Sequence, residues 1–218
     1  MFGEMRSALG IPKSVDILEH IHGLPTPEAQ SAAMESIRAI ERAAMASQVA
    51  QPGLAELMSY LDARGLRKAI CTRNFDQPVN HLLTKFLDGV LFEPIVTRDF
   101  RPPKPDPAGI LHIARSWGLT RPAGEGEEGV PVRDAGRPAD AGLMPTPAGE
   151  EVADASGLLM VGDSVDDMTA GRRAGAATVL LVNDVNQHLA EHDHTDLVIS
   201  RLDELIDVLE HGFKGREI

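Results

Sequence analysis

The first 50 residues show apolar side chains at helical spacing and contain no segment with the pattern of a strand. Ala33, Ile37, Ile40 and Ala44 recur every three or four positions, which places these side chains on one face of a helix. Thr26 and Pro27 are suited to begin that helix, because threonine caps helices and proline fits the first turn. The pattern therefore predicts a small all-helical domain or lid over residues 1–50.

From residue 51 onward, short apolar runs alternate with helical patterns. A continuous apolar run without polar alternation is typical of a strand that is buried on both faces, as in a parallel sheet covered by helices. Strands that alternate with helices predict an α/β protein with a doubly wound parallel sheet over residues 51–218. The predicted strands are 68–71, 90–96, 158–161, 178–182 and 197–199.

Residues 120–156 interrupt this pattern. They are rich in Gly, Pro, Glu and Asp and nearly free of large apolar side chains. Such a segment buries too little apolar surface to offset the entropy lost on ordering. We therefore expect a disordered surface insertion over 120–156, just ahead of the strand at 158–161.

Charge and composition exclude several classes of protein. The formal net charge of -12 argues against a nucleic-acid partner, because no basic stripe is available to balance phosphates. The one cysteine, Cys71, leaves no possibility of an intrachain disulfide. No apolar run approaches the ~20 residues needed to cross a membrane, and the N-terminus lacks a signal-peptide pattern. We expect a soluble cytoplasmic protein with no membrane partner.

The strand predicted at 158–161 runs directly into an acidic turn, Gly162-Asp163-Ser164-Val165-Asp166-Asp167. Three carboxylates this close repel one another, and a cation would offset that repulsion. In open α/β sheets, ligands bind just beyond the carboxyl ends of the strands. Mg²⁺ takes oxygen ligands, usually one or two carboxylates together with water and phosphate. The turn is therefore expected to form half of a Mg²⁺ site.

Two other predicted strands also end in polar side chains. Thr72 and Asn74 follow the strand at 68–71, and Lys104 lies in a proline-rich loop after the strand at 90–96. The prolines fix the backbone of this loop and hold the lysine on a stiff support. A hydroxyl and an amide can bind phosphate oxygens, and a lysine can neutralise their charge. Together with the acidic turn, these residues predict a site that handles phosphate.

These segments resemble three motifs of the haloacid dehalogenase-like hydrolases, in particular phosphoglycolate-phosphatase-like members with a helical cap. Ile70-Cys71-Thr72-Arg73-Asn74 is similar to the second motif of that family. Pro103-Lys104-Pro105-Asp106-Pro107 is similar to the third, and the acidic turn at 162–167 to the fourth. Gly171-Arg172-Arg173-Ala174-Gly175-Ala176 is similar to the helix end that follows the fourth motif.

The resemblance implies roles for these residues. Thr72, assisted by Arg73, Asn74 and Lys104, would bind the transferred phosphoryl group, and Thr72 and Lys104 would be the catalytic pair. Asp163 and Asp167 would serve the metal, with Asp163 as a Mg²⁺ ligand and Asp167 supporting either the metal or the lysine. Residues 1–50 would form the cap over the core at 51–218, and the substrate would be a small phosphorylated metabolite. The reaction would be Mg²⁺-dependent phosphomonoester hydrolysis through an aspartyl-phosphate.

One part of the family pattern is missing. The first motif is an Asp-x-Asp after an N-terminal strand, and its first aspartate is the nucleophile, but no Asp-x-Asp occurs in these 218 residues. In the family that strand lies between the strands that here end at Thr72 and Val161, so the first core strand is expected to be missing. Two hypotheses follow. Either the chain is a truncated and catalytically impaired phosphatase, or it is a complete non-catalytic relative that acts as a binding or regulatory module.

Other interpretations of the same residues lead elsewhere. Receiver-type signalling domains also combine acids, a hydroxyl and a Lys-Pro, but there the acid pair comes first and the lysine last. Cys71 is most simply a small buried hydrophobe. Asp166 is adjacent to Asp167, and adjacent helix positions face apart, so its part in a metal site stays open. We expect Arg98 to lie in a solvated loop. His188, His192 and His194 lack supporting cysteines, which favours a solvated helix and loop over a metal site.

Overall fold

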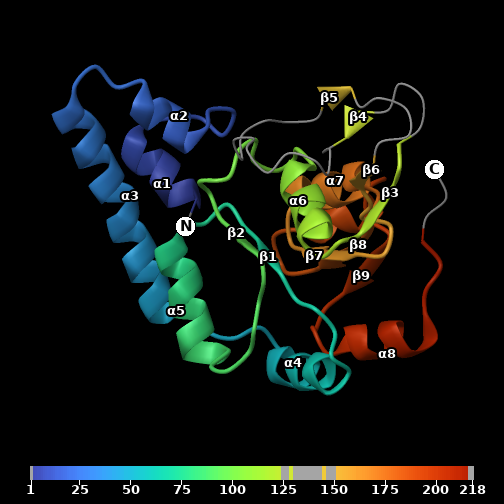
Figure 1. Cartoon of the computed structure of the whole chain (residues 1–218). Coiled ribbons are helices and arrows are strands. Elements are labelled where there is room, and N and C mark those ends of the chain that lie inside the picture. The colour runs from blue at the N-terminus through green and yellow to red at the C-terminus, as the bar shows by residue number, and fades with distance from the viewer. Residues whose placement is uncertain (1, 124–127, 130–143, 146–150, 216–218) are drawn as a thin grey trace. The chain divides into compact units, whose positions relative to one another are not determined.

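The computed structural model describes residues 2–123, 128–129, 144–145 and 151–215, with the backbone alone described at 128–129 and 144–145. The chain forms two compact units (Figure 1). The first unit contains residues 1–50 and 77–86, and the second contains 51–76 and 87–218. The boundary at residue 50 is the one expected from sequence, while 77–86 joins the helical unit from a distant part of the chain.

The first unit consists of helices α1 (Phe2–Leu9), α2 (Ile17–His22), α3 (Pro27–Ser47) and most of α5 (Asp76–Phe86). Thr26 caps α3 as predicted, because its hydroxyl oxygen accepts a hydrogen bond from Ala29 N at 3.2 Å. Asp16 caps α2, because an Asp16 carboxylate oxygen accepts a hydrogen bond from Leu18 N at 2.9 Å.

The core of this unit is assembled from all four helices. The side chains of Met5, Ile17, Ile21 and Ile37 are at most 1% exposed, and Val79 of α5 is buried with them. α5 is also tied to α3 by its polar groups, since Lys85 donates to Gln48 O at 2.9 Å. α3 is the longest of these helices, and none of the helices in the described ranges is long and apolar enough to cross a membrane.

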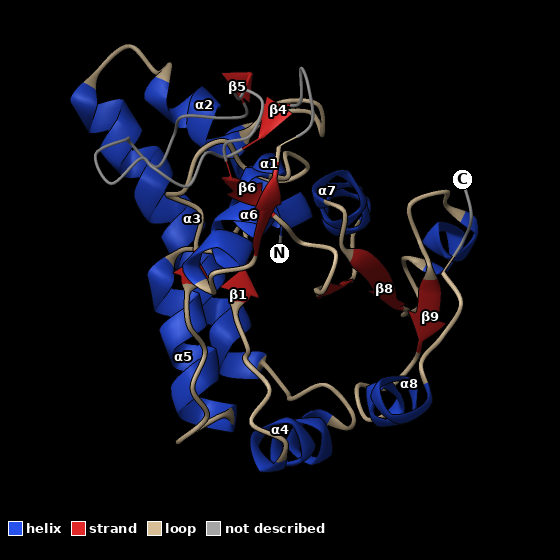
Figure 2. Ribbon diagram, turned by 45° about the vertical axis from the view of Figure 1, so that its right-hand side comes forward, coloured by secondary structure: helices blue, strands red, loops and turns tan. Residues whose placement is uncertain are grey.

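The second unit is built from short strands and covering helices (Figure 2). Its strands are β1 (Ile70–Cys71), β2 (Ile95–Val96), β3 (Thr120–Pro122), β4 (Glu128–Gly129), β5 (Met144–Pro145), β6 (Glu151–Ala153), β7 (Leu159–Gly162), β8 (Ala177–Leu181) and β9 (Leu197–Ile199). Its helices are α4 (Leu54–Ala63), α6 (Ala108–Ser116), α7 (Val165–Ala174), the short 3-10 helix η1 (Gln187–Glu191) and α8 (Glu204–His211).

The parallel strands confirm the predicted α/β class, but they form two separate sheets. β1 pairs with β2, and β7, β8 and β9 pair in that order, all in parallel. Over the described residues, β1 has no strand partner other than β2, and β7 has none other than β8. The break lies between the strands that end at Cys71 and Gly162. It agrees with the sequence expectation of a missing core strand at this position.

The burial of the strand side chains reflects the break between the two parallel sheets. The side chains of Thr178, Val179 and Leu180 in β8 are fully buried, because β8 has a neighbour on either side. Every residue of β7 is partly exposed, although its sequence has the continuous apolar pattern of a central strand. The edge of β7 that faces away from β8 therefore lacks the neighbour that would complete its burial.

Helix α7 packs unusually close to the sheet. A Cβ atom at Gly171 would lie 2.8 Å from both Met160 Cβ and Thr178 Cγ2, so this position of α7 requires glycine. Small side chains continue the contact toward α6, where Ala170 packs with Ile110 and Ala114 in one buried cluster. This close packing holds the start of α7 at the carboxyl end of β7.

The predicted disordered insertion at 120–156 is wrong at its two ends. β3 and β6 form an antiparallel ladder in which Thr120 pairs with Ala153 and Pro122 with Glu151. The few apolar residues of this segment explain the difference. Val152, Ala153 and Ala155 are buried, and the two alanines pack in the cluster that contains Ile110 of α6. Apart from the backbone of β4 and β5, the rest of the predicted insertion lies outside the described residues.

Candidate active site

The turn between β7 and α7 is organised around the carboxylate of Asp167. Its Oδ2 accepts hydrogen bonds from Asp163 N and Ser164 N, each at 3.1 Å, and from the Ser164 hydroxyl at 2.8 Å. The Ser164 oxygen in turn accepts from Asp167 N at 3.2 Å, which completes a capping box. Gly162 is required beneath this carboxylate, because a Cβ atom there would lie 2.4 Å from Asp167 Cβ.

Lys104 connects this turn to the end of β1. Its ammonium group donates to Asp167 Oδ1 at 2.5 Å and to the backbone oxygen of Cys71 at 2.6 Å. The side chains of Lys104 and Asp167 are 8% and 10% exposed, so water screens this ion pair weakly. The residues predicted as the phosphate-binding lysine and one of the metal carboxylates thus lie in direct contact.

The loop after β1 presents Thr72 in a tight turn. Its hydroxyl oxygen accepts from Asn74 N at 3.1 Å, which leaves the hydroxyl hydrogen available for an acceptor in the pocket. Arg98 holds this loop, because its backbone N donates to Asn74 O at 2.9 Å and its guanidinium to Arg73 O at 3.3 Å. The expectation of a solvated Arg98 is therefore wrong. The residue is 6% exposed and its guanidinium lies 5.5 Å from the ring of Phe75.

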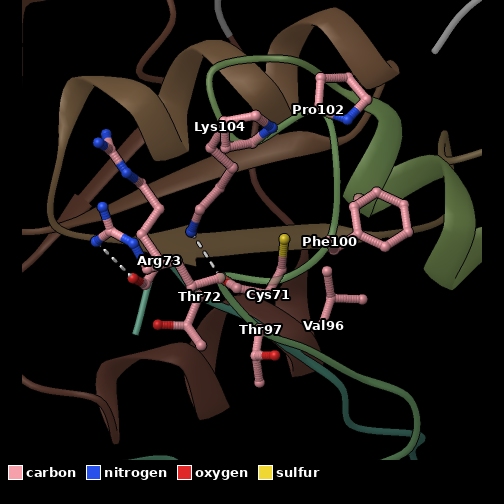
Figure 3. A pocket seen from close by; sticks show the side chains of 11 residues that line it. Cys71, Thr72, Arg73, Val96, Thr97, Phe100, Pro102 and Lys104 are labelled. Carbon is pink, nitrogen blue, oxygen red and sulfur yellow. Dashed lines mark hydrogen bonds between the residues drawn. The ribbon is translucent and has the colours of Figure 1, made fainter. Parts of the chain in front are cut away.

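The end of β1, the loop after it and the segment from β2 to Lys104 line one pocket (Figure 3). Its charged side chains are Arg73, Arg98 and Lys104, and its hydroxyl groups belong to Thr72 and Thr97. The apolar part of the lining comes from Phe100, Pro102 and their neighbours. Cationic and hydroxyl groups are the kinds that bind an oxyanion such as phosphate. Two of the cations here, Arg73 and Lys104, are each paired with an aspartate of α7.

Asp166 does not take part in the Asp167 network. Its carboxylate forms an ion pair with the guanidinium of Arg73, and the two side chains are 28% and 29% exposed. Adjacent positions of α7 thus serve two different cations, as their opposite directions on the helix predict. Together with the Lys104–Asp167 pair, this contact connects the end of β1 to the start of α7, where no strand pairing does so.

Asp163 differs from the other acids because its carboxylate accepts no hydrogen bond from any other described residue. Its side chain reaches solvent, yet the surrounding protein removes enough of its hydration to raise the pKa of the carboxyl group. The nearby Asp167 raises this pKa further, and Lys104 opposes both effects. A solvent-accessible carboxylate that no other described residue hydrogen-bonds is a suitable ligand for a cation.

Mg²⁺ fits this arrangement through Asp163 more readily than through Asp167. Both oxygens of Asp167 already accept hydrogen bonds, while those of Asp163 are free to coordinate. Within the described ranges, no three His, Cys, Asp or Glu side chains form a group that could hold a metal ion. A Mg²⁺ ion at Asp163 would therefore complete its shell with other oxygens, such as those of water and phosphate.

Cys71 lines the pocket but is unsuited to act as a nucleophile. Burial raises the pKa of its thiol, an effect that the charge of Lys104 only partly opposes. The thiol therefore stays protonated at neutral pH, whereas nucleophilic cysteines react as thiolates. Its sulfur would lie 3.0 Å from a Cβ atom at Gly109 of α6, so it packs tightly against that helix. This agrees with the interpretation of Cys71 as a small hydrophobe.

Three residues of the site were missed in the sequence analysis. Ser164 was recognisable, because Ser164-x-x-Asp167 has the spacing of a capping box. Arg98 and Asn186 gave no such signal. Asn186 donates to Asp163 O at 2.8 Å across a sequence separation of 23 residues, and only the fold brings the two together.

The comparisons with known proteins agree with the fold. A family model described as haloacid dehalogenase-like hydrolase matches residues 3–136, and a HAD-hydrolase-like model matches 137–205. An uncharacterized hydrolase of Saccharomyces cerevisiae is 38% identical over 213 residues, which cover 96% of this chain and 82% of that protein. A haloacid dehalogenase-like hydrolase domain-containing protein of Arabidopsis thaliana is 31% identical and aligns with 78% of this chain and 55% of that protein.

A solved structure shows the same fold. The crystal structure of a predicted phosphoglycolate phosphatase from Haemophilus somnus superposes with a TM-score of 0.59 at 16% identity, covering 88% of this chain and 71% of that one. The fold and the comparisons together define a hydrolase of the α/β fold class with a Rossmann-type core. The chain belongs to the haloacid dehalogenase-like hydrolases.

Proposed function

We propose that this protein binds Mg²⁺ and a small phosphomonoester and takes part in hydrolysis of the phosphate ester. The observation that carries the proposal is the position of Lys104, whose ammonium joins the carbonyl of Cys71 at the end of β1 to Asp167 at the start of α7. This contact brings the Thr72 loop and the Asp163 turn to the same place, and these supply the two kinds of group that a metal-bridged phosphate needs.

Each residue has a distinct proposed role. The hydroxyl of Thr72 donates to a phosphoryl oxygen, and Lys104 and Arg73 balance the negative charge of the phosphoryl group. Asn74 keeps the Thr72 turn closed through its backbone N–H. Asp163 holds Mg²⁺, which supplies Lewis-acid stabilisation of the phosphoryl oxygens when it is bound. Asp167 fixes the direction of Lys104 and is a positioning residue, because both of its oxygens are already occupied.

The proposed hydrolysis also requires a nucleophile that attacks the phosphorus. Hydrolysis through an aspartyl-phosphate needs a carboxylate in line with the phosphorus, and the 218 residues contain no Asp-x-Asp. We propose that such a carboxylate lies on a further strand between β1 and β7, outside residues 1–218. The unpaired edges of these two strands support this position. The second hypothesis is a non-catalytic relative, which binds the same ligands without turnover.

Binding and turnover can be measured separately. Titration calorimetry of the 218-residue chain with Mg²⁺ and then with orthophosphate should show binding of both, and Asp163→Asn should remove the Mg²⁺ signal. Absence of Mg²⁺ and phosphate binding in the wild-type chain would overturn the proposed function.

Phosphate release from a panel of small phosphomonoesters then distinguishes the two hypotheses. It should be measured on the 218-residue chain and on a chain extended by the coding sequence upstream of Met1. Mg²⁺-dependent turnover that appears with an upstream Asp-x-Asp supports the phosphatase. Binding without turnover in both chains supports the non-catalytic relative.

A further inference from the structure

Asn186 lies in the loop between β8 and η1 and is 5% exposed. Its side-chain amide forms three hydrogen bonds within the second unit. The Nδ2 group donates to Asp163 O at 2.8 Å and to Leu181 O at 3.0 Å, and Oδ1 accepts from Asn183 N at 2.6 Å. One buried side chain thus connects the end of β8, the loop that follows it and the turn after β7.

The orientation of the Asn186 amide follows from its partners. Oδ1 faces a backbone N–H, and Nδ2 faces two backbone carbonyl oxygens. The reversed amide would place an oxygen against two oxygens and an NH₂ group against an N–H, so all three hydrogen bonds would be lost. No other common side chain of this size supplies two donors and one acceptor in this geometry.

The contact with Asp163 completes a clamp on a single peptide segment. Asp163 N donates to Asp167 Oδ2 at 3.1 Å, and Asp163 O accepts from Asn186 at 2.8 Å. Side chains from α7 and from the loop after β8 therefore hold both backbone polar groups of Asp163. Its carboxylate takes no part in this clamp, so the backbone is fixed while the metal-binding group stays uncommitted.

We propose that Asn186 is a positioning residue for Mg²⁺ binding: by holding the Asp163 carbonyl, it fixes the direction of the Asp163 carboxylate. The inference rests on the proposed function, because it assigns the metal to Asp163. Groups that hydrogen-bond a metal ligand without contacting the metal typically change metal affinity by 10- to 100-fold when they are removed. Sequence separation hides this role, since Asn186 follows Asp163 by 23 residues.

The test is titration calorimetry with Mg²⁺ alone on Asn186→Ala and a matched variant. Asn183→Ala is the control, because Asn183 Oδ1 accepts from Val185 N at 2.9 Å in the same loop but does not contact Asp163. The measurement is made well below the unfolding temperature of each variant, where a loss of stability alone does not change the dissociation constant. We expect Asn186→Ala to weaken Mg²⁺ binding by about tenfold, and Asn183→Ala to change it by less than about twofold.

A second variant, Asn186→Ser, keeps the test possible if Asn186→Ala does not fold. Asn186→Ser retains a small polar group but is too short to reach the Asp163 carbonyl, and it should also weaken Mg²⁺ binding by about tenfold. Saturating Mg²⁺ should raise the unfolding temperature of wild type and Asn183→Ala more than that of either Asn186 variant.

The outcomes separate the inference from the proposed function on which it rests. Wild-type Mg²⁺ affinity in a folded Asn186→Ala or Asn186→Ser chain would overturn the positioning role and leave the proposed function standing. A wild-type chain that shows no Mg²⁺ binding would overturn both.

Discussion

At the scale of single residues, Asp163 shows the cost in stability of a carboxylate that no other described residue hydrogen-bonds. A carboxyl whose pKa is higher in the folded protein than in the unfolded chain destabilises the fold while it is ionised. Burial and Asp167 raise the pKa of Asp163 in this way. The destabilisation is present at neutral pH, decreases as the pH falls through the raised pKa, and vanishes below the unfolded value of about 4.

Asp163→Asn should therefore raise the unfolding temperature at pH 7 without Mg²⁺, because it removes a partly desolvated charge that Asp167 repels. The gain should shrink as the pH is lowered toward about 4, where the wild-type carboxyl is also neutral. Thermal unfolding followed by circular dichroism measures both values. Asp184→Asn removes a carboxylate from an exposed loop position and serves as the control. A lower unfolding temperature for Asp163→Asn at pH 7 would contradict the assignment.

The Lys104–Asp167 pair should have a large effect on stability when one partner is removed. Lys104→Met leaves the Asp167 carboxylate largely buried without its cation, which typically costs about 3 kcal/mol of unfolding free energy. Adding Asp167→Asn to this variant removes the unpaired charge and should recover part of that loss. Urea unfolding of the two single variants and the double variant gives the coupling energy. Strictly additive losses would show that the pair is not coupled.

At the scale of elements, the turn from β7 into α7 depends on what Gly162 lacks. Any side chain there would collide with Asp167, whose carboxylate holds the turn and Lys104 together. The sequence marks Gly162 as a turn residue, but it does not show that the neighbour in the way is the carboxylate of Asp167.

Gly162→Ala should destabilise the fold by about 1–3 kcal/mol, because the turn must shift to make room for a methyl group. It should also weaken Mg²⁺ binding, since the Asp163 and Asp167 backbones move with the turn. Gly157→Ala is the control, because a Cβ atom at Gly157 meets no atom within 4 Å. Chemical denaturation and calorimetry measure the two effects. Equal stability of the two variants would show that the collision is relieved without strain.

Ser164 gives a second test of the same element. Ser164→Ala removes one cap of α7 and one donor to Asp167, and loss of such a cap typically costs about 1 kcal/mol. Ser164→Thr retains the hydroxyl and should restore most of that stability. Urea unfolding compares the three chains. A Ser164→Thr chain as unstable as Ser164→Ala would show that packing of the side chain, and not the hydroxyl, matters here.

At the scale of the whole molecule, the second unit is held together by long-range contacts that cross breaks in the strand pattern. The Arg73–Asp166 ion pair connects the end of β1 to the start of α7, although β1 and β7 do not pair. Lys104 makes the same connection, because it bonds both Cys71 O and Asp167. The β3–β6 ladder brings the two ends of the predicted insertion together, because Pro122 of β3 pairs with Glu151 of β6.

Because Pro122 and Glu151 are neighbours in the ladder, we expect that a short linker in place of residues 124–150 can still join β3 to β6. A Gly-Ser linker in their place should change the unfolding free energy by less than about 1 kcal/mol, since loop-closure entropy depends only weakly on length. Val152→Asp, which places a charge at a side chain 1% exposed, should destabilise the same unit severely. Denaturant unfolding of both variants is the measurement. A large loss of stability in the linker variant would show that 124–150 contributes to the fold.

Much of this architecture was predictable from local pattern. The strand at 197–199 has the predicted bounds, and the strands predicted at 158–161 and 178–182 are each shifted by one residue. The strands predicted at 68–71 and 90–96 are shorter than expected, because only their last two residues pair as β1 and β2. Thr72, Lys104 and Asp163 were identified because each is a polar residue that follows an apolar run, and parallel strands end at one edge of a sheet. Apolar periodicity and strand order determine this much by themselves.

The tertiary structure decided what each polar residue does. Asp166 and Asp167 are equivalent carboxylates in the sequence, but one pairs with Arg73 and the other with Lys104. Arg98 has the sequence context of a solvated loop and is buried, and Asn186 reaches Asp163 from the loop after β8. Contacts such as these depend on which backbone segments meet, and burial sets the strength of each charge. Local spacing carries no information on either, so the fold alone distinguishes the uncommitted carboxylate of Asp163 from its neighbours.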